Sequence, residues 1–385
     1  MTTMAIDNKD KKVLNVPHLR FPEFSGEWEM VSLQDIATIN PKSDPLQNTF
    51  IYIDLEAVEK GELRKIQEIM REEAPSRAQR VIDNNDILFQ CVRPYQKNNY
   101  IHRILNTSNQ QWVASTGYAQ IRTTELPNYI YHLLNTDEFN RKVMVRCTGS
   151  SYPAINSEDL ATIHLYYTPD KKEQLKISRL LDLLDKRIAT QNKIIEDLKK
   201  LKSAIRKKMF SLLKDEYTES FEINQLLDYE QPTAYIVAND EYSTDTSLTP
   251  VLTANKGFIL GYTDEKFGIY QKGECIIFDD FTMDAKYVSF PFKVKSSAIK
   301  ILTAKPNVNL RFMFEYLSYW ELKSEGHKRH YISEIASLVI ELPSKERQSI
   351  IASLMTSLNS KLDIEAKTKI RYEEQKRYLL SQMFI

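Results

Sequence analysis

Glycine is scarce in this chain, with 9 residues among 385, and the scarcity excludes a class of site. Phosphate-cradling loops need glycines where backbone approaches the ligand closely. The segment Gly268–Gly273 has the glycine spacing of a P-loop, but Glu274 stands where the lysine is required. We therefore expect no nucleotide-binding site.

Cysteine is also rare, and long apolar runs are absent. Cys91, Cys147 and Cys275 are odd in number and widely spaced, which argues against a disulfide framework and a four-cysteine metal site. Residues 1–20 are polar and charged, and no later stretch reaches membrane-spanning length. These features favour a soluble protein of the reducing cytoplasm with no membrane partner.

Catalytic constellations are missing as well. Residues 40–46 contain two single prolines but lack the polar-Pro-Pro-aromatic turn of an amino-methyltransferase. His327 and His330 lack the glutamate and spacing of a zinc-protease helix. Carboxylates between residues 279 and 284 can be read as a nuclease-like cluster or as a polar loop. The first half has no matching block, so we prefer the loop and expect no catalytic, cofactor-binding or metal site.

Charge is balanced over the whole chain, with 52 Lys+Arg against 52 Asp+Glu. A surface for polyanions must therefore be local. Basic residues outnumber acidic ones between residues 170 and 214. This excess fits a solvated helix face or a stripe that faces phosphates, and both readings stay open.

What the chain does contain is a long repeat. Residues 174–210 align without a gap with residues 348–384, at an offset of about 174 residues. Each copy follows a proline, Pro169 or Pro343, and ends in Met-Phe. Asp170 with Glu173 predicts a capping box before the first copy, whereas the second copy keeps only the cap, Ser344.

Apolar residues recur in both copies at the 3–4 spacing of a coiled-coil seam. The predicted seam residues are Ile177, Leu181, Leu184, Ile188, Ile195, Leu198, Ile205 and Met209, with Ile351, Met355, Leu358, Leu362, Tyr372, Leu379 and Met383. Polar interruptions coincide, Gln191 with Glu365 and Lys202 with Lys376. We expect the two helices to pair with each other, and the alternative is two unrelated surface helices.

The same order of elements precedes each long helix. A short helix near residues 129–134, a basic loop at 141–146 and a strand at 163–165 are echoed near residues 312–317, 327–331 and 338–340. The sequence predicts an α+β fold with pseudo-two-fold symmetry, in which an antiparallel intramolecular coiled coil separates two globular domains. The expected parts are domain 1–166, helix 167–214, domain 215–340 and helix 341–385.

Segments in which aromatic and amide side chains alternate with basic residues are the best candidates for contact with nucleic acid. In the first domain these are Arg93, Tyr95, Lys97, Asn98 and Asn99, with Thr148, Ser150, Ser151 and Tyr152. In the second they are Thr253, Asn255, Lys256, Tyr262, Thr282, Lys286, Lys328, Arg329 and His330. Each alone can be an exposed turn, but together in both halves they favour nucleic acid.

At these residues the chain resembles the DNA-specificity (S) subunit of Type I restriction-modification enzymes. The resemblance covers nearly the whole chain. It rests on Leu19–Phe24 with Trp28, on Asp86–Phe89 followed by Val92–Tyr95, on Thr148–Asn156, on Thr249–Ala254 with Ile277–Thr282, and on the two Pro-x-x-x-x-Gln helix openings. These motifs are moderately specific singly and highly specific in this order.

The resemblance implies two target-recognition domains that each read one half of a split double-stranded DNA sequence, with the helices as spacer. It also implies a subunit that is not the catalyst. By the same resemblance, two modification subunits are expected to dock on it and to methylate adenine at N6 with S-adenosylmethionine, and two restriction subunits to join where present, using ATP and magnesium. The rival readings are a coiled-coil adaptor that never recognises DNA and a self-contained methyltransferase or nuclease.

Overall fold

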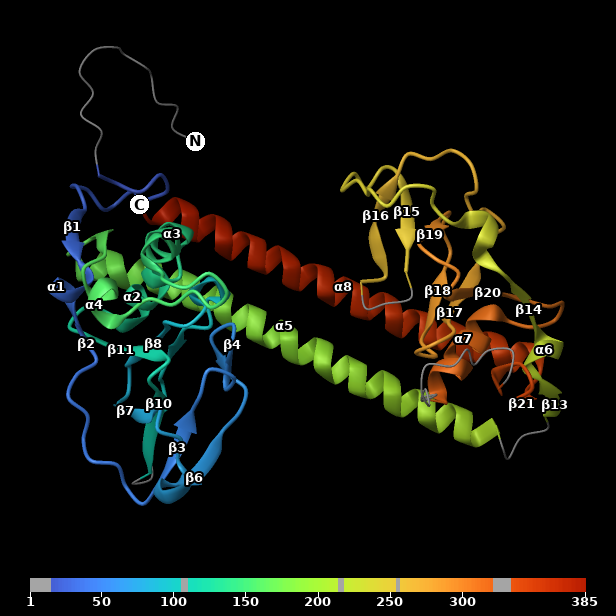
Figure 1. Ribbon diagram of the computed structural model, residues 1–385, viewed down its shortest axis with the longest axis horizontal. Coiled ribbons are helices and arrows are strands. Elements are labelled where there is room, and N and C mark those ends of the chain that lie inside the picture. The colour runs from blue at the N-terminus through green and yellow to red at the C-terminus, as the bar shows by residue number, and fades with distance from the viewer. Residues whose placement is uncertain (1–14, 105–109, 214–217, 254–256, 321–333) are drawn as a thin grey trace, which may run out of the picture. The chain divides into compact units, whose positions relative to one another are not determined.

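The structure, a computed structural model, describes residues 15–104, 110–213, 218–253, 257–320 and 334–385 (Figure 1). By its internal contacts the chain forms two compact units. Residues 1–191 and 368–385 make the first unit, and residues 192–367 make the second. Each unit therefore contains one globular domain and parts of both long helices.

The domain of the first unit contains two four-stranded sheets. One sheet has the order β2 (Ala37–Ile39), β11 (Tyr118–Thr123), β8 (Ile87–Gln90), β9 (Tyr100–Ile101), and the other β6 (Gln67–Met70), β3 (Thr49–Ile53), β10 (Gln111–Ser115), β7 (Ala78–Ile82). Strands β3 and β10 are parallel, and the remaining neighbours are antiparallel. The smaller elements are β1 (Glu29–Ser32) paired with β12 (His164–Tyr167), the hairpin β4 (Val58–Glu59) and β5 (Glu62–Leu63), and the helices α1 (Leu33–Ile36), η1 (Arg71–Glu73), η2 (Pro94–Gln96), α2 (Pro127–Leu134), α3 (Asp137–Arg146) and α4 (Ser157–Ala161).

Strand β8 lies between two cores, which explains why its first three residues are all apolar. Successive side chains of a strand point to opposite faces. Ile87 and Phe89 join the core beneath the helices, while Leu88 joins the core toward the other sheet. A strand buried on both faces carries no polar alternation.

The domain of the second unit repeats this strand order, except that its second sheet has three strands and no counterpart of β7 among the described residues. Its sheets have the orders β14 (Leu227–Glu230), β20 (Ile299–Ala304), β17 (Cys275–Asp279), β18 (Ala285–Val288) and β16 (Ile259–Thr263), β15 (Thr249–Leu252), β19 (Lys293–Val294). Strands β15 and β19 are parallel, as β3 and β10 are. The remaining elements are β13 (Glu219–Glu222) paired with β21 (Val339–Leu342), and α6 (Ile223–Leu226), η4 (Pro232–Tyr235) and α7 (Leu310–Tyr319). Strand β17 divides its side chains between two cores in the manner of β8.

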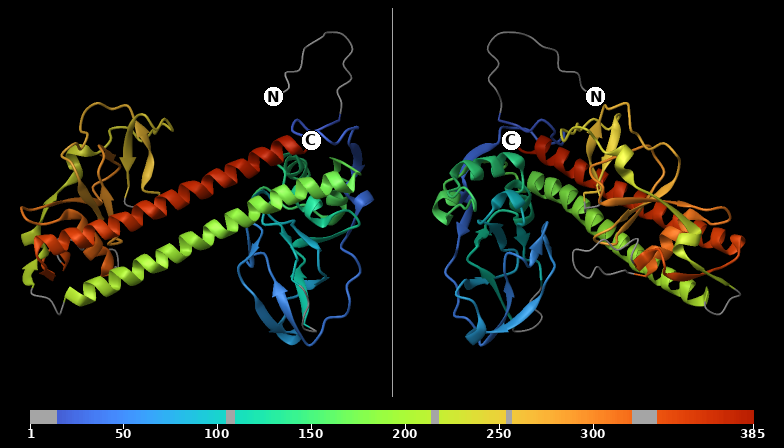
Figure 2. Two further views of the ribbon diagram at one scale, coloured as in Figure 1. Left: turned by 180° about the vertical axis from the view of Figure 1, so that it is seen from behind. Right: turned by 45° about the vertical axis from the view of Figure 1, so that its right-hand side comes forward.

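The long helices are α5 (Lys171–Leu212) and α8 (Lys345–Met383). In the first unit the start of α5 lies beside the end of α8, since Ile177 and Leu181 of α5 share one buried core with Met383 of α8 (Figure 2). In the second unit the start of α8 lies beside the end of α5, since Ile351 and Met355 of α8 share one buried core with Phe210 of α5. Both pairings require helices of opposite direction, so the predicted antiparallel packing is confirmed.

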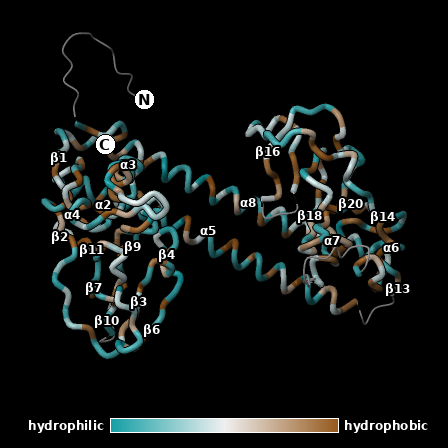
Figure 3. Tube along the Cα trace, viewed as in Figure 1, coloured by the Kyte–Doolittle hydropathy of each residue, from teal (hydrophilic) through white to brown (hydrophobic). Residues whose placement is uncertain are grey.

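Apolar residues recur among polar ones along both long helices, as Figure 3 shows. All fifteen predicted seam residues are buried or half-buried. Burial is complete at Leu181, Ile351 and Met355, where a domain also covers the helices. Among the described residues, no helix combines the length and the apolar character needed to cross a bilayer.

Two local predictions are corrected. The expected basic loop at 141–146 is the second half of helix α3, which begins where the Thr136 hydroxyl accepts a hydrogen bond from the Phe139 amide. The expected capping box before α5 is only half formed, because Asp170 caps the helix while the Glu173 carboxylate binds Arg20 and Thr168. Basic side chains do not prevent a helix, and a buried carboxylate takes the strongest donor within reach.

Candidate nucleic-acid interface

Two loops of the first domain, far apart in sequence, pair with each other. The β8–β9 loop (residues 91–99) lies against the segment at residues 147–156, which follows α3. Ala154 exchanges two hydrogen bonds of 2.9 Å with Thr148 and forms a bridge with Val92, and the Arg93 amide donates to the Pro153 carbonyl at 2.7 Å. We call these segments the first loop pair.

Arg93 and Tyr152 meet on the surface of the first loop pair. The Arg93 guanidinium lies 4.3 Å from the centroid of the Tyr152 ring, and 64% of Tyr152 is exposed. Stacking on the ring face leaves the edge of the guanidinium available for two hydrogen bonds to a guanine. Tyr95, Thr148, Ser150 and Ser151 are also exposed on these two loops.

The neighbouring amides have a structural role instead. Asn99 is 2% exposed, its Oδ1 accepts from the Gln90 amide at 2.8 Å, and its Nδ2 donates to Asn135 at 3.1 Å. Asn98 Oδ1 accepts from the Lys60 amide at 3.0 Å. The Asn99 side chain is thus engaged on both of its polar atoms and the Asn98 side chain through its oxygen, and a DNA contact by either residue stays a prediction.

Sequence reasoning missed Gln90, whose side chain holds the β8–β9 loop through hydrogen bonds. Its buried side chain donates to Gln96 at 2.8 Å and accepts from the Asn98 amide at 3.1 Å. A glutamine at the end of an apolar strand gives no signal that its amide is buried. The result is a loop whose shape is set before any ligand arrives.

In the second domain the β17–β18 loop occupies the place of the β8–β9 loop. Asp279 Oδ1 accepts from the amides of Phe281 at 2.8 Å and Thr282 at 3.3 Å, and Thr282 is exposed at the tip. Asp280 lies 3.4 Å from Lys300, and both side chains are buried. These carboxylates hold a turn, and no metal-binding group of residues occurs in the described part of the chain.

The other predicted residues of the second domain are scattered. Tyr262 lies on β16, in the other sheet from Thr282, and Thr253 is 8% exposed. Lys286 pairs with Asp284 at 2.8 Å. The candidates Asn255, Lys256, Lys328, Arg329 and His330 lie outside the described residues.

The thiols carry no sign of nucleophilic chemistry. Burial raises the pKa of Cys91 and of Cys275 to about 12, and burial also raises the pKa of Cys147. A thiol is reactive as its thiolate, so raised pKa values keep these cysteines inert near neutral pH.

A glutamine fixes each domain to its long helix. Gln174 Oε1 accepts from the Leu126 amide at 3.2 Å, at the start of α2, and its Nε2 donates to the Thr168 carbonyl at 2.8 Å. Gln348 Oε1 accepts from the Asn309 amide at 2.9 Å, at the start of α7, and its Nε2 donates to the Pro343 carbonyl at 2.9 Å. Both are buried, and we call these two places the joints.

A polar cluster lies beside the first joint. Buried His132 on α2 lies with Nε2 2.9 Å from Asp182 of α5, while Asp185 pairs with Lys376 of α8 at 2.5 Å. Burial lowers the pKa of His132, against the hydrogen bond to Asp182 that raises it. Burial alone would raise the pKa of Asp182, but His132, Arg103 and Asn128 together hold it below its usual value.

The cluster at the second joint has the opposite polarity. Glu315 on α7 is 2% exposed and accepts two hydrogen bonds from Arg206 of α5, at 2.9 and 2.6 Å. Lys202 of α5 lies 3.9 Å from Glu315 and donates to Asn359 of α8 at 2.5 Å. Here the domain supplies the carboxylate and the long helix supplies the cations.

The chain thus has two domains of similar topology, and a joint fixes each domain to an antiparallel pair of long helices. This arrangement defines a class of paired recognition modules. The family described as the Type I restriction modification DNA specificity domain matches residues 25–200 and 216–374, so the chain belongs to this family. Each match takes in one domain and most of the long helix that follows it.

Curated relatives carry the same description in their names. The Type I restriction enzyme EcoR124I/EcoR124II specificity subunit of Escherichia coli is 39% identical over 178 residues, which cover 41% of this chain and 43% of that protein. The Type I restriction enzyme HindI specificity subunit of Haemophilus influenzae is 24% identical over 191 residues, covering 48% and 38%. The alignments thus span less than half the length of either relative.

Solved structures share the fold. The S subunit of a Type I restriction-modification system from M. genitalium superimposes with a TM-score of 0.65 at 15% identity, over 96% of this chain and 99% of that one. A chain from a study of complex assembly and conformational transition of the type I R-M system gives 0.57 at 18% identity, over 92% and 97%. At these identities the likeness concerns the fold alone.

Proposed function

We propose that this chain is the non-catalytic DNA-specificity subunit of a Type I restriction-modification complex. Each domain reads one half of a bipartite double-stranded target through the loops at the β8–β9 and β17–β18 positions. The observation that carries this proposal is the first loop pair, where a braced loop presents Arg93 stacked on Tyr152 at the surface. A preorganised guanidinium of this kind suits readout of a guanine edge in the major groove.

The long helices set the unspecified gap between the half-sites. The buried glutamine joints support this proposal, because they tie each domain to the start of its own helix and leave little freedom of rotation there. Helix length then decides how far apart the half-sites lie. Inserting one heptad near Gln191 and a matching heptad near Glu365 should widen the gap and leave both half-sites unchanged.

The long helices also offer surfaces for modification subunits. Leu183 and Tyr378 in the first unit are 58% and 60% exposed, and Leu201 and Ile364 in the second are 50% and 57% exposed. Apolar side chains in such positions are candidates for packing against partner helices. S-adenosylmethionine, ATP and magnesium then belong to the modification and restriction subunits, and this chain binds none of them.

Methylome sequencing of a strain with and without this chain tests the proposal. We expect a split adenine-methylated motif that disappears with the chain. Replacing residues 1–166 with the corresponding domain of another family member should change one half-site and leave the other as the internal control. An unchanged methylome in both comparisons would favour the rival adaptor, and methylation by the purified chain alone would favour a self-contained enzyme.

A further inference from the structure

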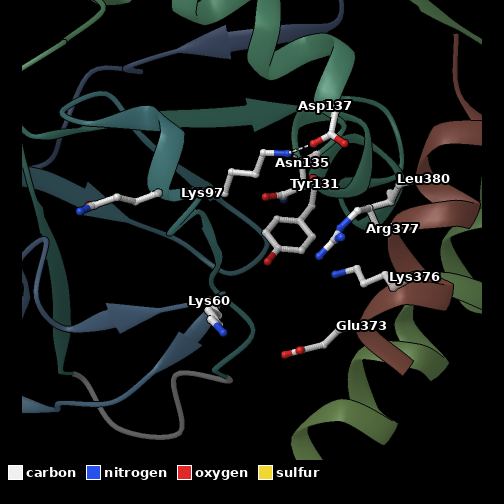
Figure 4. Close-up of a pocket in the computed structure, with 10 residues that line it drawn as sticks. Lys60, Lys97, Tyr131, Asn135, Asp137, Glu373, Lys376, Arg377 and Leu380 are labelled. Carbon is white, nitrogen blue, oxygen red and sulfur yellow. Dashed lines mark hydrogen bonds and ion pairs between the residues drawn. The ribbon is translucent and has the colours of Figure 1, made fainter. Parts of the chain in front are cut away.

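A cleft of about 300 Å³ lies in the first unit, between the domain and the last turns of α8 (Figure 4). The β4–β5 turn contributes Lys60, the β8–β9 loop contributes Lys97, and α8 contributes Lys376 and Arg377. Tyr131 lies among them, as Figure 4 shows. We call this the first cleft.

The first cleft has a surplus of positive charge. Its four cations face two carboxylates, Asp137 and Glu373. Lys97 pairs with Asp137 and Lys376 pairs with Asp185, both at 2.5 Å. Lys60 and Arg377 are exposed and make no ion pair with any described residue. Two cations are therefore available to an anion from outside.

The geometry of the β4–β5 turn is fixed so that Lys60 reaches the cleft. Lys60 and Gly61 have φ values of 50° and 81°, and the Lys60 amide is held by Asn98 at 3.0 Å. A Cβ atom on Gly61 would lie 2.4 Å from the Tyr131 hydroxyl, so only glycine permits this approach. The same asparagine thus ties the turn to the β8–β9 loop.

A second cleft, of about 630 Å³, occurs in the second unit. Lys286 of β18, Lys199 and Lys202 of α5 and Arg311 of α7 line it, opposite Glu315 and Asp363. Lys286 lies just after the β17–β18 loop and Lys97 near the end of the β8–β9 loop, and Lys202 is the repeat equivalent of Lys376. Lys199 is exposed and forms no ion pair within the described part of the chain.

We propose that both clefts bind backbone phosphates of the duplex, the first cleft beside the β8–β9 loop and the second beside the β17–β18 loop. The proposal rests on the proposed function and extends it to sequence-independent contacts. Continuity favours DNA over an acidic protein, because Lys97 belongs to the loop that presents Arg93. Phosphate contacts fix position and register on the duplex without reading bases. Their presence in both units fits two half-sites held by equivalent means.

The test is the salt dependence of binding of the full chain to a random-sequence duplex and to its methylome-defined target. Lys60→Gln/Arg377→Gln should weaken binding by the same factor on both duplexes. The slope of log affinity against log salt should become shallower by roughly 1 to 2, one for each phosphate that no longer meets a cation. Lys199→Gln should act likewise, with a change of about 1 from the second cleft.

Lys42→Gln/Arg371→Gln is the matched control, since both residues are exposed, carry the same charge and do not line either cleft. An unchanged slope in the cleft variants, or a slope change equal to that of the control, overturns the proposal. So does a loss of modification-subunit binding with DNA affinity intact, which would make the clefts protein-docking sites. Failure of the proposed function is separate, because it shows as no preference of the wild-type chain for target over random DNA.

Discussion

At equivalent positions, the first joint has the neutral imidazole of His132 and the second has the carboxylate of Glu315. His132 of the first domain meets two carboxylates of α5, whereas Glu315 of the second meets two cations of α5. In the aligned repeat, Asp182 and Asp185 correspond to Thr356 and Asn359. Glu315 docked beside Asp182 would face like charge in a buried site, which is costly. The charges on the helices therefore favour the first domain beside Asp182 and the second domain beside Arg206.

Removing the buried carboxylate should break the second joint most severely. Glu315→Ala leaves Arg206 without its carboxylate and leaves Lys202 with Asn359 alone, and we expect the free energy of unfolding of the second unit to fall by about 3 to 5 kcal/mol. His132→Ala should cost its own unit less, because Asp182 keeps Arg103 and Asn128. Urea unfolding in a Trp28→Phe/Trp112→Phe background, where Trp320 reports the second unit, measures the first effect.

Glu315→Gln is the matched control, since its amide oxygen still accepts from Arg206. The free energy of unfolding should therefore fall by less than in Glu315→Ala. Equal losses for Glu315→Ala and His132→Ala, each in its own unit, would show that the reversed polarity has no energetic consequence.

The glutamine joints should respond alike, in contrast to the charged clusters. Gln174→Ala and Gln348→Ala each leave a buried helix-start amide without its acceptor, at a cost of about 1 to 3 kcal/mol. Gln174 also donates to Glu125, so its loss should be the larger of the two. Thermal unfolding of the two variants tests this, and a cost confined to one joint would contradict their equivalence.

The equivalence of the joints could be predicted from sequence, because both glutamines follow a proline at the same distance within the repeat. The equivalence of the sheets could not. Strands β8 and β17 share alternate burial between two cores, and many apolar residues satisfy that pattern without aligning. The repeat therefore located the helices, while the domain topology needed the strand pairings.

Candidate contact residues were predicted unevenly for a similar reason. Arg93 and Tyr152 lie together as a stacked pair, yet Asn98 and Asn99 brace the loop from within. An amide side chain offers the same donors and acceptors to a base edge and to backbone, so its residue type does not decide between them. Asn99 is buried and Asn98 is half-buried, and burial of a loop residue follows from packing that the sequence does not display.

Mild acid should distinguish the two units. Burial lowers the pKa of His102 to about 4 and also lowers that of His132, whereas the unfolded value is about 6.5. Both are neutral above about pH 6.5, and their contribution to stability is lost as pH falls through the window toward about 4. We expect the free energy of unfolding of the first unit to fall by roughly 1.4 kcal/mol per histidine for each pH unit between about 6.5 and about 4.

The groups that interact with these rings are Asp182, Asp185 and Lys376 at His132, and Tyr100, Asp86 and Asp83 at His102. The second unit contains no histidine among its described residues, so it provides the comparison. His102→Gln should remove about half of the acid loss. If urea midpoints of both units fall equally between neutral pH and about pH 5.5, carboxylates rather than histidines govern the response.

The smallest expected effects come from single substitutions that compare the β8–β9 loop with the β17–β18 loop. Arg93→Lys keeps the charge but loses the planar guanidinium on Tyr152, and Thr282→Ala removes one exposed hydroxyl. Each should cost about 1 kcal/mol on the target duplex, Arg93→Lys at one position of the first half-site and Thr282→Ala in the second. Competition binding against targets substituted in one half-site measures this. A loss that is equal on random DNA would make either residue a phosphate contact, because a backbone contact cannot distinguish one base from another.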